Sequence, residues 1–187
     1  MSASLPLAEP RPALLLREAR EEDMAAVELI YGYHVRSGLA SFEEEAPDLQ
    51  ELLRRRAEVL GRGLPYLVAE QEGRVLGFAY AGPYRTRSAY RYTVEDSVYV
   101  DQRALRRGIG RMLLAALIER CTELGYRQMV AVIGDSANES SIAAHRAQGF
   151  VEAGRLAAVG YKLGQWVDSV IMQRPLGLGS TTLPERP

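Results

Sequence analysis

Apolar and polar residues alternate along the chain with two periodicities, one typical of a strand and one typical of a helix. Short apolar runs bounded by Gly, Pro or charged residues predict strands, and apolar residues three and four positions apart predict helices. The predicted strands are Ala13–Glu18, Tyr66–Glu70, Val75–Ala81, Tyr90–Val100, Gln128–Ile133, Phe150–Leu156 and Val167–Gln173, and the predicted helices are Glu21–Val35, Leu49–Leu60, Gly108–Leu124 and Asn138–Gln148. This order predicts an α/β fold, in which helices cover a mixed sheet.

The composition is that of one globular domain between two short tails. The chain has 187 residues, of which 47% are apolar and 25% charged, with a formal net charge of −1. A nearly neutral chain has no field that would attract nucleic acid or an anionic membrane. One cysteine and two histidines exclude a disulfide framework and give no basis for a metal site. We expect disordered tails at 1–12 and 176–187 around a domain at 13–175.

The chain also lacks the marks of export or membrane insertion. No basic segment followed by an apolar one opens the sequence, as a secretory leader would require. The longest wholly apolar run, Met112–Ile118, is much too short to cross a bilayer. We therefore expect a cytoplasmic protein.

An arginine-rich loop leads into the most regular helix. Residues 97–114 read SVYVDQRALRRGIGRMLL, so that a strand, a basic loop and a helix N-terminus follow one another. Backbone N–H groups at a helix N-terminus bind anions, and Gly108 and Gly110 would let them approach a pyrophosphate. A loop with solvated arginines explains the pattern equally well. A dinucleotide-binding fold is disfavoured, because Leu113 stands at the third glycine of that fingerprint.

A second motif lies downstream, where residues 138–150 read NESSIAAHRAQGF. Together the two segments resemble consecutive motifs of the GNAT acyltransferase superfamily. YAGPYRTRSAYRYTVEDSVYV, MVAVIGDSANESS and RLAAVGYKLGQWVDSVIMQR are similar to the phosphinothricin N-acetyltransferase group within it, and the similarity covers residues 14–174. Two positions depart from the superfamily pattern. Leu105 replaces the usual Gln or Arg, and His145 replaces a frequent Tyr, although His is usual in this group.

The resemblance implies a fold and a cofactor site. The GNAT fold is a twisted mixed sheet, splayed between its fourth and fifth strands, with helices on both faces. Acetyl-CoA would lie in the splay, with its pantetheine along the fourth strand and its pyrophosphate on the basic loop. The implied cofactor-binding residues are Val98, Tyr99, Val100, Arg106, Arg107, Gly108, Ile109, Gly110, Arg111 and Asn138. Asn138 also suits the N-cap of a helix, and the two roles are compatible.

The implied reaction is direct attack of a primary amine on the thioester of acetyl-CoA. Glu95 is the implied general base, because a carboxylate among apolar groups has a raised pKa. The adjacent Asp96 would point to the other face of the strand. His145 is the implied donor to the departing thiolate. The alternatives are a surface acid for Glu95 and a packed structural histidine for His145. Cys121 lies on the apolar stripe of its helix, so we reject it as a nucleophile.

The resemblance also implies an acceptor pocket beside Glu95 and a homodimer. The implied substrate-binding residues are Phe42, Arg85, Arg87, Tyr90, Tyr92 and Lys162. Arginines suit the carboxylate or phosphinate oxygens of an amino-acid analogue. A solvated hairpin explains Lys162 equally well. Dimer contacts are expected at the GYKLGQW turn, which contains Lys162.

These expectations describe an acetyl-CoA-dependent N-acetyltransferase that acts without a metal on a small amino acid or amino-acid analogue, of the phosphinothricin or methionine sulfoximine type. Two alternatives stay open. One is acetylation of a protein N-terminus or a polyamine, although the basic segment beside Glu95 disfavours a polyamine. The other is a non-catalytic acyl-CoA sensor, which would not need Glu95 or the arginines. We expect no nucleic acid and no membrane among the partners.

Overall fold

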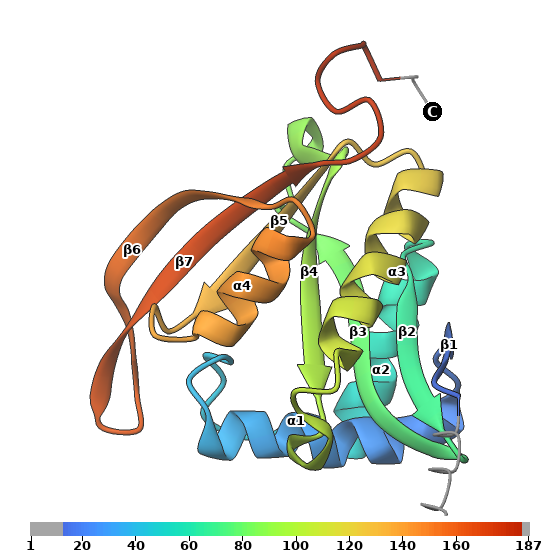
Figure 1. The fold of residues 1–187 in the computed structure, drawn as a ribbon, viewed down its shortest axis with the longest axis vertical. Coiled ribbons are helices and arrows are strands. Elements are labelled where there is room, and N and C mark those ends of the chain that lie inside the picture. Colours follow the sequence, from blue (N-terminus) through green and yellow to red (C-terminus); the bar gives the residue numbers. More distant parts are fainter. Residues whose placement is uncertain (1–12, 185–187) are drawn as a thin grey trace, which may run out of the picture.

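Seven strands form one mixed sheet in the computed structural model, which describes residues 13–184 (Figure 1). Across the sheet their order is β1-β2-β3-β4-β5-β7-β6. The strands are β1 Leu15–Glu18, β2 Tyr66–Gln71, β3 Arg74–Pro83, β4 Thr93–Val100, β5 Gln128–Gly134, β6 Val151–Lys162 and β7 Gln165–Pro175; the α-helices are α1 Met24–Ser37, α2 Leu49–Gly61, α3 Ile109–Glu123 and α4 Glu139–Ala147. The α/β fold is confirmed. The tail predicted at 1–12 lies outside the described residues.

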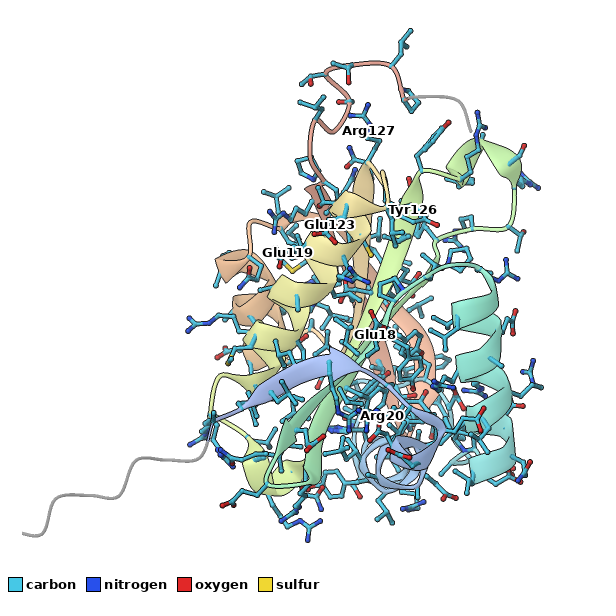
Figure 2. The ribbon with its side chains drawn as sticks, turned by 90° about the vertical axis from the view of Figure 1, so that its right-hand side faces the viewer. Glu18, Arg20, Glu119, Glu123, Tyr126 and Arg127 are labelled. Atoms are coloured by element: carbon cyan, nitrogen blue, oxygen red, sulfur yellow. The ribbon has the colours of Figure 1, made fainter. Side chains whose placement is uncertain are left out.

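Helices cover both faces of the sheet, and each face has its own hydrophobic core. The first core packs α3 against the sheet through buried side chains such as Leu113 and Leu117, and Met129 of β5 lies among them. The second packs α1 against the opposite face, where Val27 lies in one cluster with Phe78 of β3. Figure 2 shows α2 and α3 on opposite sides of the sheet. No helix of the described chain is long and apolar enough to cross a membrane.

The parallel pair β4 and β5 is hydrogen-bonded over only part of its length. Thr93–Asp96 pairs with Gln128–Ala131, and the two strands then separate. Beyond that point β4 keeps β3 as its partner, and β5 keeps β7. The predicted splay between the fourth and fifth strands is therefore present, with one edge of β4 left without a neighbouring strand.

Several boundaries differ from the sequence prediction. The strand predicted from Tyr90 begins at Thr93, because Ser88–Tyr90 forms a short 3-10 turn. The strands β6 and β7 are longer than predicted, because nearly all of β6 is exposed and therefore carries no apolar alternation. Leu176 is 1% exposed and belongs to the first core, so the packed domain continues beyond the predicted end at residue 175.

The burial of Leu176 can be tested directly. Leu176→Ala should lower the free energy of unfolding by about 2 to 5 kcal/mol, because it removes a buried side chain and leaves a cavity. Leu178→Ala is the matched control, since Leu178 is 61% exposed and its truncation should change stability by no more than about 0.5 kcal/mol. Chemical denaturation measures both. Equal stabilities of the two variants would show that the segment after β7 does not pack.

Candidate active site

A cavity of about 420 Å³ lies where β4 and β5 separate. Residues 95–99 of β4 and 131–134 of β5 form its walls, and residues 40–43, which connect α1 to α2, line it as well. Asn138, Ser141 and His145 line it from the N-cap, first turn and last turn of α4. The sheet thus opens into a cleft that reaches both of its faces.

The basic loop brings the start of α3 against the unpaired edge of β4. Gly108 is the N-cap of α3 with φ of 79°, a conformation that glycine adopts without strain, and no side chain caps the helix there. A Cβ on Gly110 would lie 3.4 Å from Val100 of β4. Asp101 holds the turn before the loop by accepting from the Arg103 backbone N–H at 2.9 Å. The helix N-terminus and the edge of β4 therefore form one continuous surface.

The other predicted loop residues surround this N-terminus. Arg106, Arg107 and Arg111 are exposed, and Arg107 donates to the side-chain oxygen of Gln71. Ile109 is buried in the first core, so only its backbone is available to a ligand. Leu105, the departure from the superfamily pattern, is 52% exposed. Exposed guanidinium groups around free helical N–H groups suit a pyrophosphate.

His34 and Asn138 fix the borders of the cleft. His34, which no motif singles out, lies with Nε2 2.8 Å from the Val100 carbonyl oxygen and so anchors the end of β4 to α1. Asn138 caps α4, because its Oδ1 accepts from the Ser141 N–H at 3.2 Å. The capping role predicted for Asn138 is confirmed. Its place in the cavity wall is compatible with the predicted cofactor contact.

Glu95 stands half-buried at the wall of the cavity. Its position on β4 alternates with that of Asp96, so it faces the side of α1 and α2 together with Tyr99. Burial raises the pKa of Glu95 above its ordinary value, the charge of Asp96 adds to the rise, and Arg85 opposes it. A carboxylate whose pKa is raised in this way is suited to accept a proton from an amine.

Asp96 faces the opposite side and is paired with His145. The Asp96 Oδ2 lies 3.0 Å from the His145 Nε2, and both side chains are buried. The second ring nitrogen, Nδ1, lies 2.8 Å from the carbonyl oxygen of Ser141. The neighbouring Cys121 is fully buried, and burial raises the pKa of its thiol to about 12, which suits a core residue rather than a nucleophile. No cluster of three or more His, Cys, Asp or Glu suited to a metal occurs among residues 13–184.

Of the six predicted substrate-binding residues, only Phe42 lines the cavity. Arg85, Arg87 and Tyr90 lie on the exposed segment between β3 and β4, although Arg85 is close enough to influence Glu95. Tyr92 lies just before β4, and the guanidinium of Arg91 covers its ring at 4.8 Å. The sequence therefore identified the basic segment before β4, but it did not show that the side chains of this segment lie outside the lining of the cavity.

Lys162 holds the loop that carries Phe42. Its Nζ donates to the carbonyl oxygen of Ser41 at 2.6 Å, and the residue is 3% exposed. Burial lowers the pKa of Lys162, while Glu44 and Glu43 oppose this effect. The Phe42 ring lies directly on Gly160 of β6, where any Cβ would overlap it. Through Ser41, Lys162 thus contacts the loop that forms part of the cavity wall.

Sequence and structure comparisons agree on the class of protein that this fold and cleft define. Residues 18–150 match the Acetyltransferase (GNAT) family, and the chain belongs to this family. A phosphinothricin acetyltransferase structure from Sinorhizobium meliloti, in complex with AcCoA, has 46% identity and a TM-score of 0.90, covering 92% of this chain and 94% of that one.

Two relatives specify the group within this family that the chain resembles. The phosphinothricin N-acetyltransferase of Alcaligenes faecalis is 54% identical over 94% of this chain and 89% of its own length. The L-methionine sulfoximine/L-methionine sulfone acetyltransferase of Salmonella typhimurium is 36% identical over 87% and 95%. The predicted resemblance to the phosphinothricin N-acetyltransferase group is confirmed.

The helix N-terminus at the start of α3 yields the first functional prediction. Gly110→Asp should abolish acetyl-CoA binding, because it adds a negative charge where the pyrophosphate is expected. Gly110→Ala is the control, since its Cβ meets Val100 at an ordinary contact distance and brings no charge. Calorimetry with acetyl-CoA measures both. Unchanged affinity in a folded Gly110→Asp variant would remove the loop from the cofactor site.

The contact between the Phe42 ring and Gly160 yields a second prediction. Gly160→Ala should displace the Phe42 ring and raise the KM for the amine roughly 5- to 150-fold, since overpacking of this kind costs about 1 to 3 kcal/mol. The acetyl-CoA affinity should stay unchanged. Gly154→Ala is the control on the same strand, because a Cβ there meets nothing within 4 Å. If steady-state kinetics give the two variants the same amine KM, Phe42 does not shape the acceptor site.

Proposed function

We propose that the protein transfers acetyl from acetyl-CoA to the primary amine of a small amino acid or amino-acid analogue, of the phosphinothricin or methionine sulfoximine type. The observation that carries the proposal is the half-buried Glu95, whose pKa is raised, in the wall of the cavity between β4 and β5. The substrates named for the relatives of this chain support the choice of acceptor.

Acetyl-CoA would bind along the surface shared by β4 and α3. We assign its pantetheine to the unpaired edge at Val98–Val100 and its pyrophosphate to the N–H groups at the start of α3, from Gly108 to Arg111. The exposed side chains of Arg106 and Arg107 supply positive charge beside those groups. Asn138 would contact the cofactor from the start of α4. This path places the thioester next to Glu95.

Glu95 would remove a proton from the substrate ammonium. The amine nitrogen then forms a bond to the thioester carbonyl carbon, and the C–S bond breaks with its electron pair on sulfur. The charge of Arg85 near Glu95 favours an acceptor that carries an acidic group, and it disfavours a polyamine. We retain Arg87, Tyr90 and Tyr92 as proposed acceptor contacts from the same segment.

His145 was predicted to protonate the thiolate, and this stays a prediction. Each of its ring nitrogens already faces an acceptor within the protein, one on Asp96 and one on Ser141. Proton donation would therefore require the ring to release one of these bonds. A protonated ring that lines the cavity would also supply positive charge to a departing thiolate while keeping both bonds.

We further propose a cytoplasmic homodimer, formed through the hairpin of β6 and β7. The strand β6 is an edge of the sheet, and nearly all of it is exposed. Large apolar side chains stand on it and at the start of β7, including Val159, Tyr161 and Trp166, which are 55%, 58% and 69% exposed. A long apolar edge strand is a site at which a second chain can pack.

The role of Glu95 can be tested by removing its basicity while keeping its shape. Glu95→Gln should lower kcat by roughly 10²- to 10⁴-fold, leave acetyl-CoA affinity nearly constant and flatten the acidic limb of the pH–rate profile. Glu119→Gln is the control, because Glu119 is exposed on α3 (Figure 2). If Glu95 binds the substrate ammonium instead, KM should rise more than kcat falls. A near-normal kcat with an unchanged acidic limb would refute the assignment.

The dimer can be tested by sedimentation at micromolar concentration. The native protein should sediment as a species of about twice the 20.7 kDa chain mass. Trp166→Glu should shift it toward the monomer, because it places a charge in the apolar contact. Leu29→Glu, at an exposed site on α1, is the control and should sediment like the native protein. A native protein found only as a 20.7 kDa species would contradict the proposal.

A further inference from the structure

Asp96 is one of the most deeply buried charged residues in the described chain, and the proposed reaction does not use it directly. Its side chain is 2% exposed, and Oδ2 lies 3.0 Å from the His145 Nε2. Its Oδ1 is buried and has no hydrogen-bond partner among the residues that the structure describes. A buried carboxylate with only one bonded oxygen costs stability unless a positive charge compensates it. His145 is the cation within reach.

The surroundings of the His145 ring suit a proton on each nitrogen. The Ser141 carbonyl oxygen, 2.8 Å from Nδ1, can only accept, so a hydrogen on Nδ1 completes that bond. Nε2 lies 3.0 Å from an Asp96 carboxylate oxygen, and a second hydrogen there lets the ring donate to the ionised Asp96. Burial acts to lower the pKa of His145, but the hydrogen bond and charge of Asp96 and the Ser141 carbonyl outweigh it, so the pKa is raised.

We propose that Asp96 is a positioning residue that holds His145 as its protonated partner, so that the buried pair is electrically neutral and Glu95 is the only uncompensated negative charge at this point of β4. The inference rests on the proposed function of Glu95. Without the imidazolium, the charge of Asp96 would be uncompensated beside Glu95 and would favour protonation of Glu95.

The groups that face this cluster come from every element packed around it. Asp96 faces Cys121 on α3 and His145 on α4. Glu95 faces Tyr80 on β3 and Arg85 on the segment after β3. Of these groups, His145 is the one that carries the charge opposite to that of Asp96. Replacing His145 therefore leaves the charge of Asp96 uncompensated, and Glu95 stays on its own face of the sheet.

The two members of the pair should therefore shift the pH–rate profile in opposite directions. His145→Gln keeps a donor toward Asp96 but removes the positive charge, so the pKa of Glu95 should rise and the acidic limb should move to higher pH by roughly one unit or more. Asp96→Asn removes the negative charge, so the limb should move to lower pH. In the Asp96→Asn background, His145→Gln should no longer move it upward.

If Asp96 and His145 served only to pack the core, their replacement would lower activity or stability but leave the acidic limb of the pH–rate profile at the same pH. Limbs that stay unchanged in both single variants, or an upward shift that persists in the double variant, would overturn the proposal. Glu119→Gln again serves as the control for a remote loss of charge.

A second measurement depends neither on Glu95 nor on enzymatic activity. The chain has two histidines, so imidazole NMR follows two rings, and His34→Gln assigns them. His145 should be protonated at neutral pH in the native protein, and its titration midpoint should fall by roughly one unit or more in Asp96→Asn. A neutral His145 ring in the native protein would overturn the pairing. If Glu95→Gln leaves turnover intact while His145 titrates as expected, the proposed base fails and the pair stands.

Discussion

The hydrogen bonds between β4 and β5 end at Asp96 and Ala131, and the chemistry of the protein depends on that break. A fully paired sheet would have no cavity at this point and no free edge along Val98–Val100. Because β3 and β7 continue to pair with the separated strands, each wall of the cleft remains rigid. The capped start of α4 and the loop that carries Phe42 line this opening, and Gly110 at the start of α3 lies against Val98 and Val100 of β4.

The same strand serves two purposes because successive side chains point to opposite faces. Glu95 faces the side of the sheet that α1 covers, where burial raises its pKa. Asp96, one residue later, is directed to α4 and meets His145. A single strand thus carries a candidate base and, on its other face, the carboxylate that pairs with His145. The spacing of the two carboxyl groups is fixed by the backbone and not by flexible loops.

The sequence predicted the strands and helices with local signals, and it failed where tertiary contacts decide. The α/β order, the helix beginning near Gly108 and the capping of α4 by Asn138 follow from periodicity and turn residues. The length of β6 could not be predicted, because an exposed edge strand shows no apolar alternation. The Lys162–Ser41 and His34–Val100 contacts join residues 121 and 66 positions apart, and no local pattern reports such contacts.

We propose above all that the opening between β4 and β5 is a catalytic site for an amino-acid amine. Release of free thiol from acetyl-CoA, measured with a panel of amines, tests it most directly. We expect thiol release with phosphinothricin and methionine sulfoximine, and none above background with a polyamine or with a peptide that has a free N-terminus. Thiol release only with the polyamine or peptide would contradict the acceptor assignment, and binding of acetyl-CoA without thiol release on any amine would contradict catalysis itself.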